Sequence, residues 1–503
     1  MGEPFYITTA ISYPNGPPHI GHAYEAIAAD AIARFQRSRG RDVRFQTGTD
    51  EHGLKMAQAA RAEGIEPRAF SDKMSRLFQE MCDTLNVSYD RFIRTSQPDH
   101  YQASQAIWKA MEERGDLYLD RYEGWYSVRD EAYYEPEELT NADDGSKLSP
   151  QGTPVEWTVE ESWFFRLSKY QQPLLDLYAA NPEFIRPESR RNEVVRFVEG
   201  GLKDLSISRT SFDWGVPVPG SNHHVMYVWL DALTNYITGL GYPGHTELWR
   251  RYWPADIHLI GKDVVRFHAV YWPAFLMSAG IELPKQVYGH GFLLSRGEKM
   301  SKSVGNVIDP MELAGRFGVD ALRYFLLREV PFGQDGSYSA EAIVARANAE
   351  LANSFGNLAQ RTLSMIYKNL DGVLPAAGEA SADVELLELV RNAAGGEVPE
   401  AFERLAFSVG IEAWLRAVFA CNAYVDTQAP WALRKTDPER MAAVLGTLVV
   451  AVRELARAIA PIIPMSADKL LTLIDAGEGG TPIAQPQPLF PRLELEEEPE
   501  TAA

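Results

Sequence analysis

The alternation of short apolar runs with helix-patterned stretches constrains the fold of this chain more than any other feature. Residues 4–12, PFYITTAIS, read as a buried strand, and the loop YPNGPP that follows is rich in residues that break regular structure. Residues 22–39 then repeat apolar side chains at helical spacing until Gly40 ends the helix, and residues 42–53 predict a second strand. A strand, helix and strand in this order form a right-handed parallel unit, whose ligand-binding loops lie at the carboxyl ends of the strands.

The same alternation returns in the stretches HHVMYVWLDALTNY, DIHLIGKDVVRFHAVYWPAFLMSAG and QVYGHGFLL. Between the two halves, residues 116–225 lose the rhythm and are rich in Tyr, Trp, Glu and Pro, which indicates an inserted subdomain. After about residue 345, alanine- and leucine-rich amphipathic stretches replace the strand patterns. We therefore expect a doubly wound parallel α/β domain of Rossmann type with an insertion, followed by an all-α helical bundle.

Charge and cysteine content limit the class of protein. The formal charge of −20, from 69 acidic and 49 basic residues, shows no basic footprint on average, so contact with RNA must use a local basic face. The two cysteines, Cys82 and Cys421, argue against a disulfide framework and a multi-cysteine metal site. No segment approaches the about 18 uninterrupted apolar residues of a membrane span. We expect a cytoplasmic protein that is neither exported nor held in a membrane.

Two histidines mark the first loop that can carry chemistry. His19 and His22 stand three residues apart where a helix opens directly after a strand, so their side chains share one face. The helix N-terminus supplies unpaired N–H groups, Gly21 lets a ligand approach the backbone, and imidazoles can donate to phosphate oxygens. A histidine pair alone is more often a cap or a satisfied core pair. The Pro-Pro approach and the strand-to-helix context favour a nucleoside triphosphate site instead.

A lysine-rich loop, GEKMSKSVGN at residues 297–306, is the second candidate. Short Lys/Ser loops are usually solvated surface, because lysine is flexible and well hydrated. Together with the histidines, Lys299 and Lys302 favour a functional loop. Two cationic segments that meet around a triphosphate stabilise charge on the α-phosphoryl group and on the leaving pyrophosphate.

HIGH followed by KMSKS, with an insertion between them, resembles the signature pair of class I aminoacyl-tRNA synthetases. The resemblance to the methionyl branch extends over the whole catalytic region, through YITTAISYPNGPPHIGHAYE, FQTGTDEHGLK, YVWLDALTNY, HLIGKDVVRFHAVYWPAFL and GHGFLLSRGEKMSKS. It implies that the chain activates L-methionine with ATP and Mg²⁺ to methionyl adenylate and pyrophosphate, and then transfers methionine to the 3′ end of tRNA(Met). No side-chain nucleophile is needed for this reaction, in which positioning and electrostatics supply the catalysis.

The resemblance implies a set of site residues. The methionine site falls on Ile11, Tyr13, Asp50, Trp229, Ala232, Leu233, Tyr236, Val264, Phe267, His268 and Trp272. The ATP site falls on His19, Gly21, His22, Gly261, Asp263 and Lys302, and the catalytic role on His19, His22, Lys299 and Lys302. Asp50 can accept from the substrate ammonium, and an aromatic slot suits a thioether. Each aromatic residue alone is more often ordinary core.

In the helical region, NLAQR at 357–361 and PWALRK at 430–435 resemble anticodon-reading elements of the family. Asn357 and Arg361 can hydrogen-bond exposed base edges, and Trp431 can stack on a splayed base. The plainer alternative is polar helix surface and a capping Trp after Pro430.

The resemblance also divides the chain. We expect the catalytic domain over 1–115 and 226–295, a connective insertion over 116–225, the KMSKS loop with a linking segment over 296–345, a helical anticodon-binding domain over 346–480, and a C-terminal tail over 481–503.

The insertion departs from the family pattern. Many members carry cysteine-based zinc knuckles there, but residues 124–158 contain neither Cys nor His. We therefore expect no zinc and an insertion stabilised by its own aromatic core. The chain also ends soon after the bundle, without the appended dimerising domain of some relatives, so a monomer is expected.

Three alternatives remain open at this stage. Class I synthetases for leucine, isoleucine or valine usually carry a much larger insertion used for editing. A small-molecule nucleotidyltransferase with the same histidine loop does not account for the bundle with Asn357, Arg361 and Trp431. A non-catalytic RNA-binding protein of synthetase descent is disfavoured because His19, His22, Asp50, Lys299 and Lys302 are all present.

Overall fold

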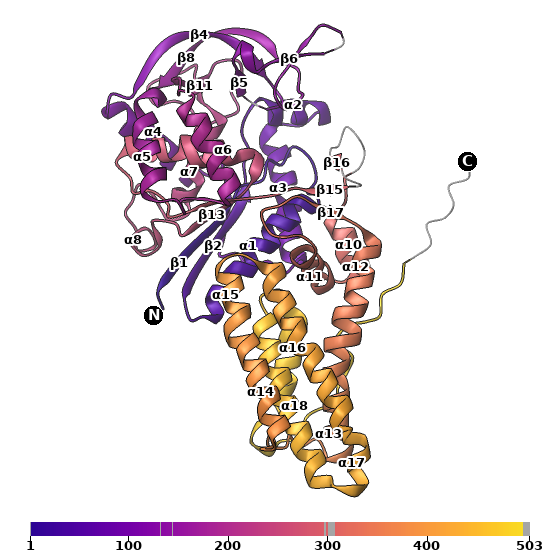
Figure 1. The fold of residues 1–503 in the computed structure, drawn as a ribbon. Helices are drawn as coiled ribbons and strands as arrows, with labels where there is room; N and C mark the ends of the chain where they lie inside the picture. The colour runs from indigo at the N-terminus through magenta and orange to yellow at the C-terminus, as the bar shows by residue number, and fades with distance from the viewer. Residues whose placement is uncertain (1, 131, 143, 296–297, 300–306, 496–503) are drawn as a thin grey trace, which may run out of the picture. The chain divides into compact units, whose positions relative to one another are not determined.

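The computed structural model describes residues 2–130, 132–142, 144–295, 298–299 and 307–495 (Figure 1). The chain folds as two compact units. The first unit comprises residues 1–29, 40–83 and 87–290, and the second comprises 30–39, 84–86 and 291–503. Each unit is described by itself.

A six-stranded sheet forms the centre of the first unit. Its strand order is β3-β2-β1-β13-β14-β9, and every pairing in this order is parallel. The bounds are β1 Pro4–Thr9, β2 Asp42–Thr49, β3 Arg91–Arg94, β9 Ile185–Arg186, β13 Ile257–Gly261 and β14 Val287–His290. The order runs one way from β1 to β3 and the other way from β13 to β9, so the topological switch lies between β1 and β13, where ligands bind in such folds. The expected doubly wound α/β fold is confirmed.

Helices follow the strands as their patterns predict. The helices and helical turns of the residues up to 280 are α1 Ile20–Ser38, α2 Leu54–Glu63, α3 Pro67–Thr84, α4 Pro98–Glu113, η1 Pro136–Glu138, η2 Leu167–Tyr170, α5 Gln171–Ala180, α6 Glu188–Glu199, α7 Val228–Thr238, α8 Glu247–Tyr252, η3 Lys262–Val264, η4 Phe267–Tyr271 and α9 Trp272–Ala279. Of these, residues 30–38 of α1 and residue 84 of α3 group with the second unit. Helix α4 packs against both α7 and α9, and their apolar side chains join one core with those of β13 and β14.

The insertion is built on a long antiparallel ribbon, seen at the top of Figure 1. Strands β4 Leu117–Ser127 and β8 Glu156–Phe165 pair along their length, with β5 Ala132–Tyr134 and β10 Leu205–Ser206 at the edges of the sheet. Short pairs are formed by β6 Thr140–Asn141 with β7 Lys147–Leu148, and by β11 Ser208–Arg209 with β12 Val225–Met226. Strand β9 lies inside the predicted insertion of 116–225 but joins the parallel sheet, so that stretch does not stand wholly apart from it.

Polar contacts, as well as aromatic ones, hold the tip of the insertion. The rings of Tyr126 and Tyr133 lie 4.8 Å apart, in keeping with the expected aromatic contacts. Beside them, Asp130 Oδ2 accepts hydrogen bonds from Ser149 Oγ at 2.6 Å and Thr153 Oγ1 at 2.5 Å. Sequence reasoning missed this cluster, because Ser, Thr and Asp in a turn-rich stretch read as ordinary loop residues.

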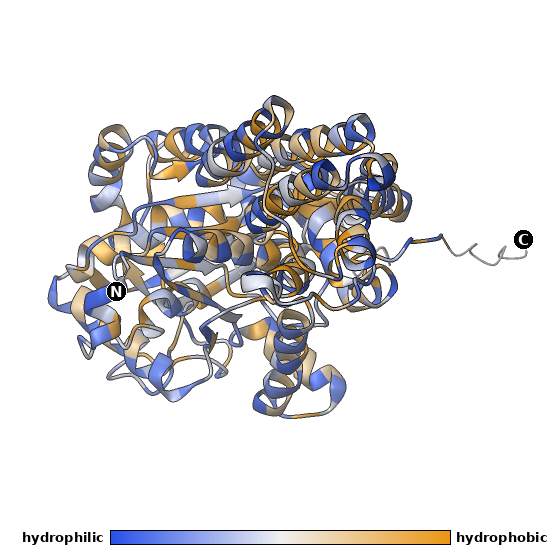
Figure 2. Ribbon diagram, turned by 90° about the horizontal axis from the view of Figure 1, so that it is seen from below, coloured by the Kyte–Doolittle hydropathy of each residue, from blue (hydrophilic) through white to orange (hydrophobic). Residues whose placement is uncertain are grey.

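The second unit is mainly helical, as expected. Its helices and turns after the lysine-rich loop are α10 Pro310–Phe317, α11 Val319–Glu329, α12 Ala340–Arg346, η5 Ala347–Gly356, α13 Asn357–Asn369, α14 Ser381–Asn392, η6 Ala393–Glu397, α15 Val398–Glu403, α16 Phe407–Gln428, α17 Pro430–Thr436, α18 Pro438–Ile459, α19 Pro464–Asp475 and η7 Glu478–Gly480. A small sheet joins β15 Leu293–Ser295 to β16 Glu298–Lys299 and β17 Gly336–Tyr338. Apolar and polar residues occupy different sides of the bundle helices (Figure 2).

A buried ion pair ties several segments of this unit together. Arg323 of α11 is fully buried and donates to Asp30 Oδ2 at 2.6 Å. It also donates to the carbonyls of Ile462 and Leu85. The guanidinium therefore joins α1, the end of α3 and the turn between α18 and α19.

In the described part of the chain, no helix has the length and apolar character that crossing a membrane requires.

Candidate functional site

The histidine pair lies at the switch point, where the chain leaves β1 and enters α1. The His19 N–H donates to His22 Nδ1 at 3.1 Å, and the Gly21 N–H donates to His19 Nδ1 at 3.0 Å. The ring centroids are 3.8 Å apart. Because each ring accepts through Nδ1, the proton of each neutral imidazole sits on Nε2, which is thereby a donor. The prediction that the two side chains share one face is confirmed.

Gly21 serves the histidines as well as the backbone. A Cβ at this position would lie 2.8 Å from His19 Cε1 and 3.0 Å from His19 Nδ1. Any side chain would therefore push the His19 ring out of its place.

Two carboxylates approach the carboxyl end of β13. A Cβ on Gly261 would lie 2.8 Å from Asp263 Oδ1, so Asp263 folds back over this glycine. Glu25, one turn after His22 on α1, bonds through Oε2 with His290 Nε2 at 2.8 Å, at the end of β14. Burial raises the pKa of Glu25, and Asp263 acts in the same direction, while His290 and a backbone hydrogen bond to Gly261 oppose the rise. The ends of three neighbouring strands thus converge on one group of polar side chains.

Sequence reasoning missed Glu25 and His290. Both stand inside stretches that carried the family resemblance, HIGHAYE and GHG. Their pairing depends on β14 lying beside β13, which no local pattern shows.

Aromatic residues of α7 and of the segment after β13 form a packed group beside this edge. Trp229 stacks on Phe267 with ring centroids 3.8 Å apart and planes within 5°. Tyr236 Oη donates to His268 Nε2 at 2.6 Å, and His268 Nδ1 donates to the Val264 carbonyl at 2.9 Å. Burial lowers the pKa of His268 to about 4, so its ring is neutral at pH 7. The group therefore presents neutral polar atoms among aromatic faces.

A second buried histidine, His258, packs against the aromatic group. Trp272 Nε1 donates to His258 Nε2 at 3.3 Å, and the Tyr236 ring stacks on His258 with centroids 4.0 Å apart. Burial lowers the pKa of His258 well below its usual range. Ala232 and Leu233 of α7 are also buried.

The segment from Ile11 to Tyr13 extends alongside the end of β2. The Ser12 N–H donates to the Gly48 carbonyl, and the Asp50 N–H donates to the Ser12 carbonyl, both at 2.9 Å. Tyr13 Oη donates to the His52 carbonyl at 2.9 Å. These backbone bonds bring Asp50, Ile11 and Tyr13 to one edge, and their expected role in binding methionine stays a prediction. His22, Glu25 and Ser12 also line one small cavity there.

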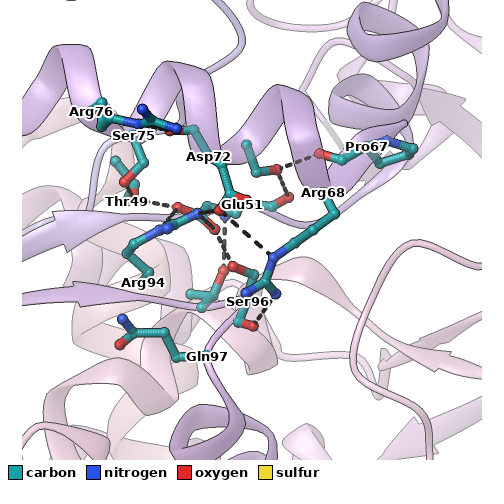
Figure 3. A network of polar contacts seen from close by, with 12 residues as sticks. Thr49, Glu51, Pro67, Arg68, Asp72, Ser75, Arg76, Arg94, Ser96 and Gln97 are labelled. Carbon is teal, nitrogen blue, oxygen red and sulfur yellow. Dashed lines mark hydrogen bonds and ion pairs between the residues drawn. The ribbon is translucent and has the colours of Figure 1, made fainter. Parts of the chain in front are cut away.

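Glu51, the neighbour of Asp50, is anchored beneath this edge (Figure 3). Its side chain is fully buried and accepts from Thr49 Oγ1 at 2.8 Å, from Arg94 Nε at 2.7 Å and from Ser96 Oγ. Arg94 also pairs with Asp72 of α3 at 2.5 Å. Because Glu51 directly follows Asp50, anchoring Glu51 also restrains the backbone that carries Asp50. Sequence reasoning named Asp50 but missed this network.

The three candidate anticodon residues belong to the second unit. The Arg361 guanidinium lies 5.4 Å from the centroid of the Trp431 ring, and Arg361 Nη2 lies 3.8 Å from Asp426 Oδ1. Trp431 is 49% exposed, which is unusual for the largest apolar side chain. Asn357 is exposed one turn before Arg361 on α13, so both project from the same side of the helix.

The lysine-rich loop is described only in part. Lys302 lies outside the described residues, and of Lys299 only the backbone is described, in β16. Their expected roles stay predictions. Among the described residues, no group of three or more His, Cys, Asp or Glu side chains is placed to hold a metal ion.

Two family models match consecutive parts of the chain. Residues 5–363 match the model described as tRNA synthetases class I (M), and residues 379–489 match the anticodon binding domain of methionyl tRNA ligase.

Similar proteins match the chain over almost its whole length. A methionine–tRNA ligase of Brucella suis is 59% identical over 505 residues, which cover 97% of this chain and 98% of the relative. One of Mycobacterium tuberculosis is 55% identical over 518 residues, with 99% of both chains covered. The solved structure of M. tuberculosis methionyl-tRNA synthetase in complex with methionyl-adenylate superposes with a TM-score of 0.94 at 55% identity, covering 97% of this chain and 100% of that one.

Proposed function

The chain belongs to the methionyl-tRNA synthetases of class I, and we propose how its residues share the work of that reaction. The enzyme joins L-methionine to tRNA(Met) in two steps, through methionyl adenylate. The observation that carries the assignment is the convergence, at the carboxyl edge of β1 and β13, of the histidine pair, the Gly261 segment and the aromatic group.

ATP binds at the switch point. The Nε2–H groups of His19 and His22 donate to phosphate oxygens, and the positive end of α1 favours the negative charge there. Gly261 and Asp263 receive the adenosine, where a carboxylate can accept from ribose hydroxyls. Glu25 joins them, since it lies beside the same strand end. Mg²⁺ arrives with the triphosphate as part of the substrate.

Methionine binds between Asp50 and the aromatic group. Asp50 accepts from the ammonium group, and Ile11 and Tyr13 flank it. Trp229, Phe267 and Trp272 surround the side chain with aromatic faces, which suit a polarisable sulfur. Neutral His268 and Tyr236 offer the thioether a polar contact without a charge, and a charged side chain is rejected by the cost of its desolvation.

Catalysis rests on position and charge. The methionine carboxylate attacks the α-phosphorus in line, and His19, His22, Lys299 and Lys302 stabilise the negative charge on the transferring phosphoryl group and on pyrophosphate. The terminal ribose hydroxyl of tRNA then attacks the carbonyl of the adenylate and releases AMP. We assign no side chain as a general base.

The bundle reads tRNA(Met). Trp431 stacks on a base of the anticodon, and Asn357 and Arg361 hydrogen-bond to base edges. The exposure of Trp431 and Asn357 and the contact of Arg361 with the Trp431 ring support these roles. We further propose that the enzyme works as a cytoplasmic monomer without zinc. The buried state of both cysteines supports the last point, and elemental analysis of the purified chain tests it.

ATP–pyrophosphate exchange tests these assignments. With each of the twenty amino acids in turn, we expect exchange with methionine alone, and its loss in Lys302→Ala and His22→Ala. Asp50→Asn is expected to raise the KM for methionine at least about a hundredfold, because the ammonium loses a charged hydrogen bond worth about 3 kcal/mol. Exchange that depends on another amino acid, or an Asp50→Asn variant with unchanged kinetics, contradicts the assignment.

A further inference from the structure

A carboxylate that belongs to neither proposed substrate site is buried between two imidazoles. Asp231, in the first turn of α7, lies 2.6 Å through Oδ2 from His52 Nδ1 and 2.6 Å through Oδ1 from His100 Nε2. The side chains of all three residues are at most 1% exposed. Burying a carboxylate costs free energy unless the carboxylate is paired and hydrogen-bonded. The two imidazoles offset this cost, and we ask what the buried carboxylate does.

The three residues come from three elements that meet at the methionine site. His52 stands two residues after Asp50, the proposed acceptor of the ammonium group. Asp231 stands among Trp229, Ala232 and Leu233, which line the proposed side-chain pocket. His100 lies in the first turn of α4 and contacts the Asp231 oxygen that His52 does not. The carboxylate thus links the part of the site that holds the ammonium group to the part that holds the thioether.

The outer bonds of both imidazoles are also satisfied. His52 Nε2 lies 2.9 Å from Tyr101 Oη, which can donate to it. His100 Nδ1 lies 3.0 Å from Thr238 Oγ1, and Thr238 Oγ1 donates to the Thr234 carbonyl at 3.0 Å. Ser104 Oγ also lies 3.2 Å from His100 Nε2, so both ring nitrogens of His100 have polar partners.

The two imidazoles also affect the pKa of the Asp231 carboxyl group. Burial acts to raise the pKa of Asp231, but the charges and hydrogen bonds of His52 and His100 outweigh it and lower the pKa to about 2. Asp231 is therefore a carboxylate at neutral pH and accepts hydrogen bonds through both of its oxygens.

Other contacts between β2 and α7 lie further along the helix. Gln46 Nε2 donates to Asn235 Oδ1 at 2.9 Å, and Arg44 Nη2 donates to the Gly239 carbonyl at 3.0 Å. Both lie towards the C-terminal half of α7. At its N-terminal turn, beside Trp229, the bond that connects α7 to the Asp50 loop is that of His52 with Asp231.

We propose that Asp231 is a positioning residue for methionine: its carboxylate, held by His52 and His100, keeps the Asp50 loop and α7 at the separation that fits the ammonium group and side chain of one amino acid. The inference rests on the methionine site proposed above. Asp231 touches no substrate and acts through Asp50 and Trp229. Loss of the bridge weakens methionine binding more than ATP binding, because the bridge joins the loop after β2 to α7, whereas the histidine pair follows β1 and Gly261 ends β13.

The test compares two buried carboxylates in the full-length enzyme. Asp231→Asn keeps the shape but removes the charge and one acceptor. Asp116→Asn is the matched control, because Asp116 is also fully buried and bonds to Lys169, Tyr170 and Ser278, away from both substrate sites. The KM for methionine, the KM for ATP, kcat in ATP–pyrophosphate exchange and Tm are measured for each.

We expect Asp231→Asn to raise the KM for methionine about tenfold while the KM for ATP stays within about twofold. Asp116→Asn is expected to lower Tm without changing either KM. If Asp231→Asn behaves like Asp116→Asn, its role is structural and the proposal is overturned.

Tyr101→Phe keeps the test decisive if Asp231→Asn fails to fold. This variant removes only the hydroxyl that donates to His52 Nε2, and we expect a two- to fivefold higher KM for methionine with Tm almost unchanged. An unchanged KM overturns the proposal. Asp50→Asn separates the two claims. If Asp50→Asn also leaves the KM for methionine unchanged, the proposed methionine site is wrong. If Asp50→Asn is the one variant that raises this KM, the methionine site stands and the proposed role of Asp231 is wrong.

Discussion

At the scale of single residues, the start of α1 depends on the space beside Gly21, which has no side chain. The His19 ring occupies the space that a Cβ on Gly21 would need, at 2.8 Å. The orientation of both imidazoles, through the two bonds to Nδ1, follows from this packing.

Gly21→Ala is therefore expected to displace His19 and to lower kcat for ATP–pyrophosphate exchange about a hundredfold, since a misplacement of about 1 Å in such a site costs that much. Gly315→Ala is the control, because a Cβ there meets nothing within 4 Å. Equal kcat in the two variants would show that the His19 position does not matter.

His268 gives the fold a pH dependence. Its folded pKa, lowered by burial from 6.5 to about 4, lies below that of the unfolded chain. The neutral ring therefore stabilises the fold fully above pH 6.5, and this contribution is lost as the pH falls towards 4, by about 3 kcal/mol when protonation is complete. His258, which Tyr236 places beside it, acts in the same direction.

Urea unfolding of the wild type and of His268→Gln between pH 4 and 8 measures this contribution. We expect the difference in the free energy of unfolding between the two to be constant above pH 6.5 and to shrink below it. A difference that stays the same at all these pH values contradicts a neutral His268.

At the scale of elements, a buried ion pair anchors α11 in the second unit. Arg323 supplies bonds to Asp30 and to three carbonyls, and removal of one partner of a buried pair leaves an uncompensated charge. We expect Arg323→Met to lower the free energy of unfolding by about 3 to 5 kcal/mol in urea titrations.

Arg416→Met serves as its control. Arg416 pairs with Glu397, but both side chains are more than half exposed, so the change is expected to stay within about 0.5 kcal/mol. A similar small effect in Arg323→Met would mean that Arg34, which also bonds to Asp30, suffices alone.

The elements also show what the sequence could predict. Strands β1 and β2 and helix α1 were expected within a few residues of their observed bounds, because their apolar periodicity is strong and Gly40 marks the helix end. Strand β9 was not, since two residues, Ile185 and Arg186, carry no periodicity and their partner β14 lies about a hundred residues away. The histidine pair and Asp50 were found by motif. Glu51, Asp231 and His100 were missed, because their meaning lies in contacts between distant segments.

At the scale of the whole molecule, a chain with a formal charge of −20 binds an RNA. Because the net charge of the chain does not attract RNA at long range, the recognition that we propose rests on local contacts of Arg361 and Trp431.

We expect Trp431→Ala to lower kcat/KM for tRNA in aminoacylation about 10- to 100-fold, because stacking on one base contributes about 1 to 3 kcal/mol. Methionine-dependent ATP–pyrophosphate exchange, which needs no tRNA, should stay unchanged. Phe419→Ala, at a similarly exposed aromatic residue of α16, is the control and should leave both activities intact. Equal losses in both variants would place the anticodon contact elsewhere.

The central claim is that one site, at the edge of β1 and β13, holds both halves of methionyl adenylate. A crystal structure of this chain with a non-hydrolysable methionyl-adenylate analogue tests it most directly. The account predicts adenosine density beside Gly261 and Asp263, the phosphoryl group at His19 and His22, and the thioether against Trp229 and His268. Density for the analogue at any other place on the chain would contradict it.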